Sequence, residues 1–179
     1  MKSQGFSLIP FPSACPLPAV KITGTVSRQE GLLYLEYDLL GPVDAIAIPS
    51  PAAMPLRRDS LWNETCFELF FSPEKTDQYW EFNFSPSGHW NVFSFEAYRQ
   101  RMQEEQAFAS LPFSVHLRPG ALNLSVELDL EKIIPRDQAL KAGICAVVRY
   151  SEGDCTYWAL THPGTQPDFH RKDGFIIEC

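Results

Sequence analysis

The sequence lacks an excess of positive charge. It has 15 Lys and Arg residues against 22 Asp and Glu residues, a formal net charge of −7, and no run of Lys and Arg longer than two residues. A protein that contacts the phosphate backbone needs a positively charged face. We therefore expect no nucleic-acid partner.

Long apolar stretches are also missing. No run approaches the roughly 18 residues of a membrane-spanning helix. Near the N-terminus, Pro10, Pro12, Pro16 and Pro18 interrupt any stretch that could form the apolar core of a signal peptide. These absences predict a cytoplasmic protein with no membrane partner.

The usual catalytic and metal-binding motifs are absent as well. The 5 cysteines are an odd number, and none of them forms a CxxC or a Cys/His metal spacing. Cys66 and Cys145 lie in apolar runs, where a reduced thiol acts as a small hydrophobic group. There is no nucleophile elbow, glycine-rich phosphate loop or HExxH. We predict no catalytic residues, no metal site and no resident cofactor.

What the sequence does contain is short stretches of period-two alternation. With 179 residues, 45% of them hydrophobic and 21% charged, the chain has the size and composition of one globular domain, 1–179. Alternation between regular turn signals predicts about ten short antiparallel strands in a β-sandwich or barrel. We expect strands at 20–26, 32–39, 44–49, 65–71, 79–85, 90–95, 113–118, 121–130, 142–150, 156–160 and 174–179.

Three segments depart from this pattern. Residues 1–18 are rich in proline and are expected to form an irregular N-terminal arm. One or two short helical pieces are expected, at 96–106 and as a turn at 130–134. Residues 49–60 show neither the alternation of a strand nor the periodicity of a helix, and long irregular loops of this kind often carry function.

The stretch 79–95, YWEFNFSPSGHWNVFSF, raises the question of which aromatic rings are core. If PSGH is the hairpin loop, the phenylalanine-rich faces of the two strands pair as the core side: Trp80, Phe82 and Phe84 with Asn91, Phe93 and Phe95. The other face then carries Tyr79, Glu81, Asn83 and Trp90. Polar side chains fixed beside a flat ring suit sugar binding. The alternative is a solvated face on which Trp90 covers a neighbouring strand.

Alternation in 65–71, TCFELFF, places Glu68 on the face opposite Phe67, Leu69 and Phe71. On neighbouring strands, Glu68 and Glu81 could lie ~5 Å apart, which is also the carboxyl separation of retaining glycosidases. Any two acidic residues on adjacent strands meet this condition. A small hydrolase is therefore a weaker alternative.

The C-terminal stretch THPGTQPDFHRKDG (161–174) gathers His162, Asp168 and His170 in an irregular loop. These residues are candidates for contacting a ligand, and in principle for binding a metal or for acid–base chemistry. The alternative is that they hold the loop through hydrogen bonds to its backbone. Because eight residues between the histidines is not a known ligand spacing, we expect ligand-orienting or structural roles.

Four further residues are candidate ligand contacts. Arg58, in the loop before Trp62, and Arg149, on a predicted strand, could each hold a carboxylate or phosphate through two hydrogen bonds. Their alternative role is ordinary surface charge. Trp62 and Trp158 stand at strand ends and are expected at the rim of a binding face.

The motifs LWNETCFELFF, YWEFNFSPSGHWNVFSF and TYWALTHPGTQPDFH together resemble the DOMON-like branch of the type 9 carbohydrate-binding modules. The resemblance covers most of the chain. It implies a jelly-roll-like β-sandwich whose relatives bind sugars or haem, and which is sometimes fused to an enzyme of cell-wall precursor synthesis. Asn63 and Glu64 stand where an Asp pair is common in that family, which weighs against bound calcium.

The resemblance and the residue patterns together predict a non-catalytic module that binds a small sugar-like ligand. In this interpretation, tryptophan rings stack on the sugar, and the polar residues Arg58, Glu68, Glu81, Asn83 and His170 bind its hydroxyl groups. One alternative is a haem-binding module with ligands drawn from Met54, Met102, His162 and His170. Another is a protein-interaction domain that uses its aromatic face. An enzyme of cell-wall precursor metabolism is the expected partner protein.

Overall fold

Twelve antiparallel strands and four 3₁₀ turns make up the secondary structure of the computed structural model, which describes residues 3–13 and 19–179. The strands are β1 (Gln4–Pro10), β2 (Lys21–Gln29), β3 (Leu32–Leu40), β4 (Cys66–Pro73), β5 (Tyr79–Phe84), β6 (Trp90–Phe95), β7 (Gln103–Glu104), β8 (Phe113–Arg118), β9 (Ala121–Asp129), β10 (Leu140–Arg149), β11 (Cys155–Ala159) and β12 (Ile177–Glu178). The 3₁₀ turns are η1 (Val43–Ala45), η2 (Leu61–Asn63), η3 (Leu130–Lys132) and η4 (Lys172–Gly174).

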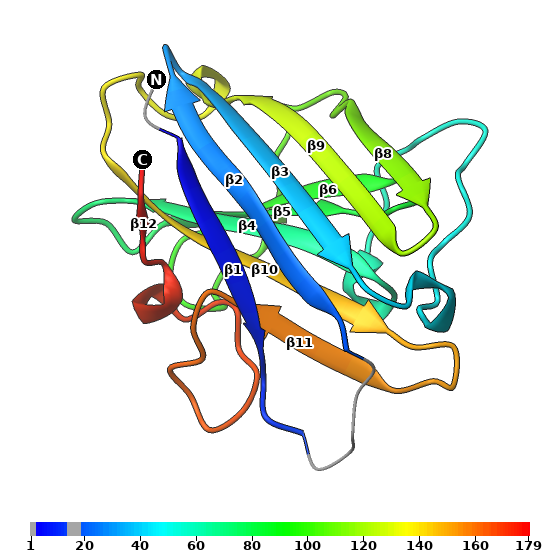
Figure 1. Cartoon of the computed structure of the whole chain (residues 1–179). Coiled ribbons are helices and arrows are strands. Elements are labelled where there is room, and N and C mark those ends of the chain that lie inside the picture. The colour runs from blue at the N-terminus through cyan, green and yellow to red at the C-terminus, as the bar shows by residue number, and fades with distance from the viewer. Residues whose placement is uncertain (1–2, 14–18) are drawn as a thin grey trace.

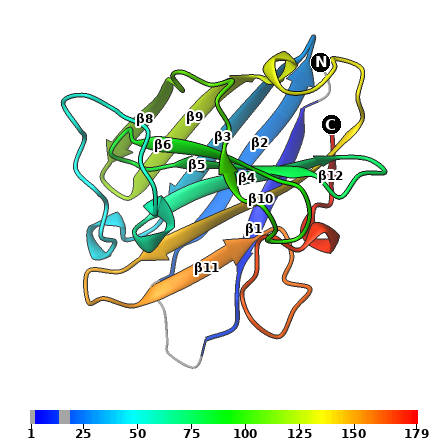
Figure 2. The same cartoon turned by 180° about the vertical axis from the view of Figure 1, so that it is seen from behind.

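The strands form two layers that share one strand, β1 (Figure 1). The front layer, as seen in Figure 1, has the order β1-β2-β3-β9-β8. The back layer, which faces the viewer in Figure 2, has the order β7-β6-β5-β4-β10-β11, with β12 also paired to β10. Residues 4–8 of β1 pair with β2, whereas Ile9 and Pro10 pair with β11, so β1 closes one side of the sandwich.

The core lies between the layers because each strand alternates apolar and polar residues. From the front layer, every second residue of β3 (Leu33, Leu35, Tyr37, Leu39) points inward, and from the back layer Phe67, Leu69 and Phe71 meet them. Each such side chain contributes about 1.5–3 kcal/mol when fully buried. The Tyr37 hydroxyl crosses the core and donates to the backbone oxygen of Glu68 at 2.7 Å. The predicted all-β sandwich is therefore confirmed.

The β5–β6 hairpin has a different register from the expected one. Gly88 N–H donates to Ser85 O, Gly88 has a φ of +91°, and Ser85 pairs with His89, so the loop has three residues, 86–88. Pro at the second position and Gly at the fourth suit this turn. Phe84 therefore faces Trp90. Because a slip of one residue moves every side chain to the other face, Phe93 and Phe95 point outward and Trp90 and Val92 point inward.

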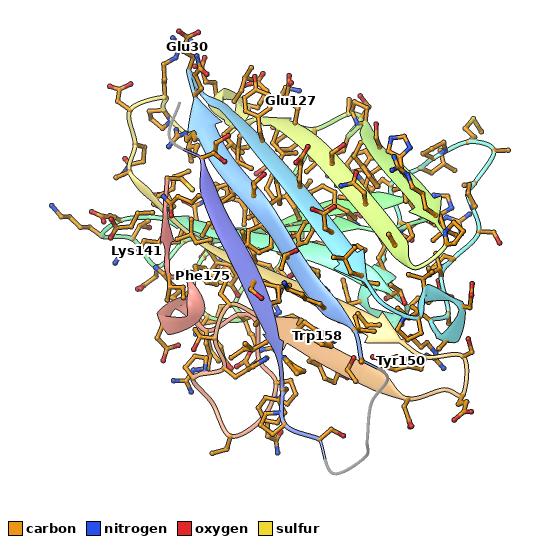
Figure 3. The ribbon with its side chains drawn as sticks, viewed as in Figure 1. Glu30, Glu127, Lys141, Tyr150, Trp158 and Phe175 are labelled. Atoms are coloured by element: carbon orange, nitrogen blue, oxygen red, sulfur yellow. The ribbon has the colours of Figure 1, made fainter. Side chains whose placement is uncertain are left out.

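Two tryptophans that were expected at a ligand face belong to the core instead. Trp90 is 4% exposed and Trp158 5% exposed, and both belong to the cluster between the layers. On β11, Trp158 (labelled in Figure 3) donates from Nε1 to Thr156 Oγ1 at 2.8 Å. Strand alternation turns its neighbour Tyr157 outward, where it is 38% exposed. Trp90 and Trp158 therefore lie between the layers and not on the outer face where they were expected.

The expected arm and helix were also wrong. Residues 4–10, within the segment 1–18 that was expected to be irregular, form strand β1; residues 1–2 and 14–18, including Cys15, lie outside the described residues. The segment 96–106, expected to be helical, contains turns and the short strand β7. The turn expected at 130–134 is present as η3. In the described part of the chain, no helix has the length and apolar character needed to cross a membrane.

Trp90→Ala is expected to lower the free energy of unfolding by about 3–5 kcal/mol, because it removes a large ring from a packed core. Urea denaturation followed by circular dichroism measures this loss. The control is Met54→Ala, at a residue that is 69% exposed in the loop before β4, and it should change stability by less than about 0.5 kcal/mol. A loss for Trp90→Ala as small as that of the control would mean that Trp90 faces solvent.

Candidate functional site

A cavity of about 320 Å³ opens on the outer face of the back layer. Its floor consists of outward-facing strand residues, and its walls come from the segments before β4, after β6 and after β11, the last two of which lie over this face in Figure 2. The floor residues are Glu68, Phe70, Glu81, Phe95 and Val147. The walls are Trp62, Arg99, Met102, Tyr157, Pro167, Phe169 and His170.

Strand pairing brings the polar floor residues together. Across the back layer, Asn83 on β5 lies opposite Glu68 on β4, and Glu68 lies opposite Cys145 on β10. In the next outward-facing row, Glu81 lies opposite Phe70. Glu68 and Glu81 are therefore diagonal neighbours on adjacent strands, within reach of each other's field.

The burial of the Glu68 carboxyl group is not offset by an ion pair or by a strong hydrogen bond. Its side chain is 3% exposed, its Oε1 has no hydrogen-bond partner, and its Oε2 has only the Cys145 thiol at 4.0 Å. Burial, and then the charge of Glu81, raise the pKa of Glu68 well above its usual value. A buried carboxyl group with no cation beside it takes up a proton rather than remain charged.

Glu81 is better supported but is still disfavoured as an anion. Its Oε1 accepts from Asn83 Nδ2 at 2.8 Å, and its Oε2 lies 3.8 Å from Nε2 of His170. Burial raises the pKa of Glu81 to about 7, against the opposing effect of the Asn83 hydrogen bond. Near neutral pH, small changes in the surroundings therefore decide whether this carboxyl group is charged.

His170 is held in place by Tyr79. The Tyr79 hydroxyl accepts from the backbone N–H of Arg99 at 3.0 Å and lies 2.9 Å from Nδ1 of His170. The hydroxyl that accepts from Arg99 still has its own hydrogen to donate, and when it donates to Nδ1 the imidazole hydrogen is on Nε2, toward Glu81. Burial, followed by the charge of Arg99, lowers the pKa of His170 to about 4. The His170–Glu81 contact is therefore not an ion pair near neutral pH.

The cation at the cavity wall is already paired. Arg99 donates from Nη2 to Asp168 Oδ1 at 2.9 Å, and the Tyr98 hydroxyl donates to the other oxygen of Asp168 at 2.5 Å. Arg99 and Arg101 both have a φ near +50°, which is uncommon for residues other than glycine and shows how tightly the segment after β6 turns. Asp168 thus ties this segment to the C-terminal loop and pairs with Arg99, whose charge still acts on Glu81 and His170.

Aromatic rings form the apolar part of the cavity. Trp62 packs edge-on against Phe93, and Phe169 packs edge-on against Tyr157. Phe70 and Phe95 contact the His170 ring at centroid distances of 5.1 and 5.2 Å. A ligand in this cavity would meet aromatic faces and edges beside two carboxyl groups.

Of the eleven candidate residues, the structure brings six together. Trp62, Glu68, Glu81 and His170 line the cavity, Asn83 bonds to Glu81, and Asp168 bonds to Arg99 and to the backbone N–H of His170. Five lining residues were not candidates from the sequence, namely Phe70, Phe95, Arg99, Tyr157 and Phe169, and Met102 was a candidate only as a haem ligand. The correct hairpin register would have identified Phe95, and strand alternation Phe70 and Tyr157.

The remaining five candidates lie elsewhere. Trp90 and Trp158 are core residues. The Arg58 side chain is exposed, while its neighbour Arg57 stacks on Trp90 and donates to Asn91 Oδ1. Arg149 donates to the backbone oxygen of Asn63, and His162 Nε2 lies 2.9 Å from the backbone oxygen of Ile9. These five residues therefore do not line the cavity.

The residues present do not fit haem or a metal ion. Met102 and His170 line the same cavity, but Nε2 of His170, the nitrogen left to ligate iron, faces Glu81 Oε2. Met54 lies on an exposed loop, and His162 sits beside Phe11. Among the described residues, no group of three or more His, Cys, Asp or Glu side chains could hold a metal ion.

No protein-family model matches the chain, and no curated protein matches it significantly. Among solved structures, the fold is similar to that of a candidate carbohydrate-binding protein from Bacteroides uniformis ATCC 8492, with a TM-score of 0.73 and 15% identity over 98% of this chain and 84% of that chain. This likeness confirms the sandwich fold that the sequence resemblance implied.

Two weaker matches are structures of a family 9 carbohydrate-binding module from Caldicellulosiruptor kristjanssonii, one in complex with glucose and one in complex with cellotriose. The TM-score is 0.47 for both, at 9% and 10% identity, over 80% and 85% of this chain and 68% and 71% of the module.

Glu81→Gln is expected to become more stable relative to the unchanged protein as the pH rises. Folding raises the pKa of Glu81 from 4.5 to about 7, so the stability it contributes is complete below pH 4.5 and is lost as the pH rises through about 7. At about 1.4 kcal/mol per pKa unit, the difference in free energy of unfolding should change by roughly 3 kcal/mol across this window. Urea denaturation at a series of pH values measures it.

The control for this measurement is Glu127→Gln, an exposed carboxylate on β9 of the front layer (Figure 3). It should run parallel to the unchanged protein at every pH. Parallel curves for Glu81→Gln as well would show that Glu81 titrates like an exposed side chain.

Proposed function

We propose that this protein binds a small carbohydrate, without reacting with it, in the cavity on the outer face of the back layer. The observation that carries the proposal is the floor itself, where a buried carboxyl oxygen of Glu68 has no hydrogen-bond partner beside aromatic walls. A buried polar atom left unpaired is costly, and a ligand hydroxyl would supply the missing bond. The fold shared with a candidate carbohydrate-binding protein supports the same conclusion.

The size of the cavity favours a short sugar. At about 320 Å³, it lies at the lower end of the range of ligand pockets, about 300–1,000 Å³. That volume suits one or two sugar rings rather than a polymer chain. Met102 at the wall is 44% exposed, so a second ring would leave the cavity over its apolar side chain.

The walls and floor suit the two kinds of surface that a sugar presents. The C–H face of a ring needs a flat apolar partner, which Trp62 or Phe169 would provide. Hydroxyl groups need donors and acceptors in fixed positions, which Glu68, Glu81 and the Nε2–H of His170 would provide. Because these groups stand on strands or are bonded to strands, they are held before a ligand arrives.

Binding without chemistry is favoured over hydrolysis. A retaining glycosidase needs one ionised carboxylate as its nucleophile and one protonated carboxyl as its acid. Here burial raises the pKa of both Glu68 and Glu81. Glu81, with a pKa of about 7, is therefore not the fully ionised nucleophile that this reaction requires near neutral pH.

The same carboxyl groups disfavour a ligand that bears phosphate. A nucleotide sugar would bring phosphates close to Glu68 and Glu81, with Arg99 already paired to Asp168. Of the soluble sugars, nucleotide sugars and cell-wall precursors that a cytoplasmic protein would meet, we therefore favour the unphosphorylated ones. A partner enzyme that makes or uses such a sugar is part of this proposal.

A saturating sugar is expected to raise the melting temperature by several degrees. At 100 times the dissociation constant, one site adds about 2.7 kcal/mol to the free energy of unfolding. A thermal-shift screen of mono- and disaccharides, with isothermal titration calorimetry of the hits, measures the effect. Trp62→Ala should weaken binding about tenfold or more, because it removes a wall ring.

The matched control is Tyr34→Ala, a half-buried aromatic residue on β3 of the front layer, which should leave sugar affinity unchanged. Failure of every sugar to shift the melting temperature would contradict the proposal. In that event, a Soret band in the visible spectrum would favour haem, and its absence would favour a protein-interaction module.

A further inference from the structure

We propose that the sugar recognised by this site carries a protonated amine, and that the ammonium group binds between Glu68 and Glu81. The inference rests on the proposed function and narrows its ligand to the amino sugars. It starts from the geometry of the floor, where two carboxyl groups lie diagonally on adjacent strands beneath one cavity.

In their ionised forms, the two carboxyl groups of the floor have more acceptor oxygens than the neighbouring donors satisfy. Glu68 Oε1 has no partner, Glu68 Oε2 has only a thiol at 4.0 Å, and Glu81 Oε2 lies beyond hydrogen-bond distance from His170, at 3.8 Å. The amide of Asn83 is already used on Glu81 Oε1. A ligand that satisfies three oxygens must bring several donors to one place. An ammonium group has three donors and no acceptor, whereas a hydroxyl has one donor and adds another acceptor.

The charged groups around the floor do not supply these missing hydrogen-bond donors. The Arg99 guanidinium is bonded to Asp168, His170 is neutral near pH 7, and Asp59 adds further negative charge near Glu81. The other titratable groups near the two carboxyl groups are thiols and phenols, which are neutral or negative and never positive. They are Cys66 on β4, Tyr79 on β5, Cys145 on β10 and Tyr37 in the core beneath. A bound ammonium group would thus place a positive charge directly between these carboxyl groups, neither of which is bonded to Arg99.

Binding of a cation would change the protonation of the floor. In the free protein, burial keeps Glu68 protonated and leaves Glu81 with a pKa of about 7. An ammonium group beside them favours their ionised forms, so protons leave the site as the ligand enters. A neutral sugar that donates hydroxyl groups to protonated carboxyls would release none. The number of protons released therefore separates an amine from a hydroxyl at this position.

The experiment is isothermal titration calorimetry at about pH 6.5, in two buffers with different ionisation enthalpies. The probes are three matched pairs that differ only at one carbon: glucosamine and glucose, galactosamine and galactose, mannosamine and mannose. At least one amino sugar should bind about tenfold or more tightly than its neutral counterpart, since hydrogen bonds to charged groups are the stronger class. Its binding enthalpy should differ between the buffers in the direction of proton release.

Two variants locate the effect. Glu68→Gln keeps the shape of the side chain and should remove most of the preference for the amine and most of the proton release, while the neutral sugar loses less affinity. Glu127→Gln, on the front layer, should keep both. Near-ultraviolet circular dichroism confirms that each variant is folded.

If the neutral sugars bind as tightly as the amino sugars, with no proton release, this inference fails and the proposed function stands. If none of the six monosaccharides binds, this inference fails, and the disaccharides of the thermal-shift screen decide whether the proposed function fails with it. A preference for the amine that survives Glu68→Gln unchanged would also overturn the inference, because the ammonium group would then lie elsewhere.

Discussion

The pairing of Phe84 with Trp90 across a three-residue turn is the constraint on which the binding face depends. It fixes the register of β5 and β6, and through the pleat it decides which side chains enter the core and which face the cavity. With this register, Glu81 and Phe95 lie on the same outer face as Glu68 of β4. A shift of one residue in β6 would bury Phe95 and expose Trp90, and the cavity would lose a floor ring.

On that face, the cost of burying two carboxyl groups sets the chemistry of the site. The structure supplies Glu81 with one amide donor and supplies Oε1 of Glu68 with nothing. The nearest cation, Arg99, is paired with Asp168, and this ion pair joins the two segments that wall the cavity. The site is thus rigid, partly apolar and short of hydrogen-bond donors. These three properties favour a small ligand with several hydrogen-bond donors, and among such ligands they favour an amine.

Much of the fold could be predicted from the sequence, because alternation of apolar residues is unambiguous where strands are long. The pattern of Phe67, Leu69 and Phe71 was enough to place Glu68 on the outer face. The register of the β5–β6 hairpin was predicted wrongly because SPSGH was taken to have a four-residue loop. Ser, Pro and Gly stand at the positions that suit a three-residue loop. Arg99 could not be placed, since its segment is rich in good helix formers and is held in turns by contacts distant in sequence.

The central claim is that Glu68 and Glu81 are buried without a bonded cation and hold protons near neutral pH. Nuclear magnetic resonance titration of ¹³C-labelled glutamate side chains in the ligand-free protein tests it directly, with Glu68→Gln and Glu81→Gln to assign the signals. The account predicts that Glu81 titrates near pH 7 and that Glu68 titrates well above the usual range of a carboxyl group. Titration of both residues near pH 4.5 would contradict it, because the floor of the cavity would then be an ordinary pair of solvated anions.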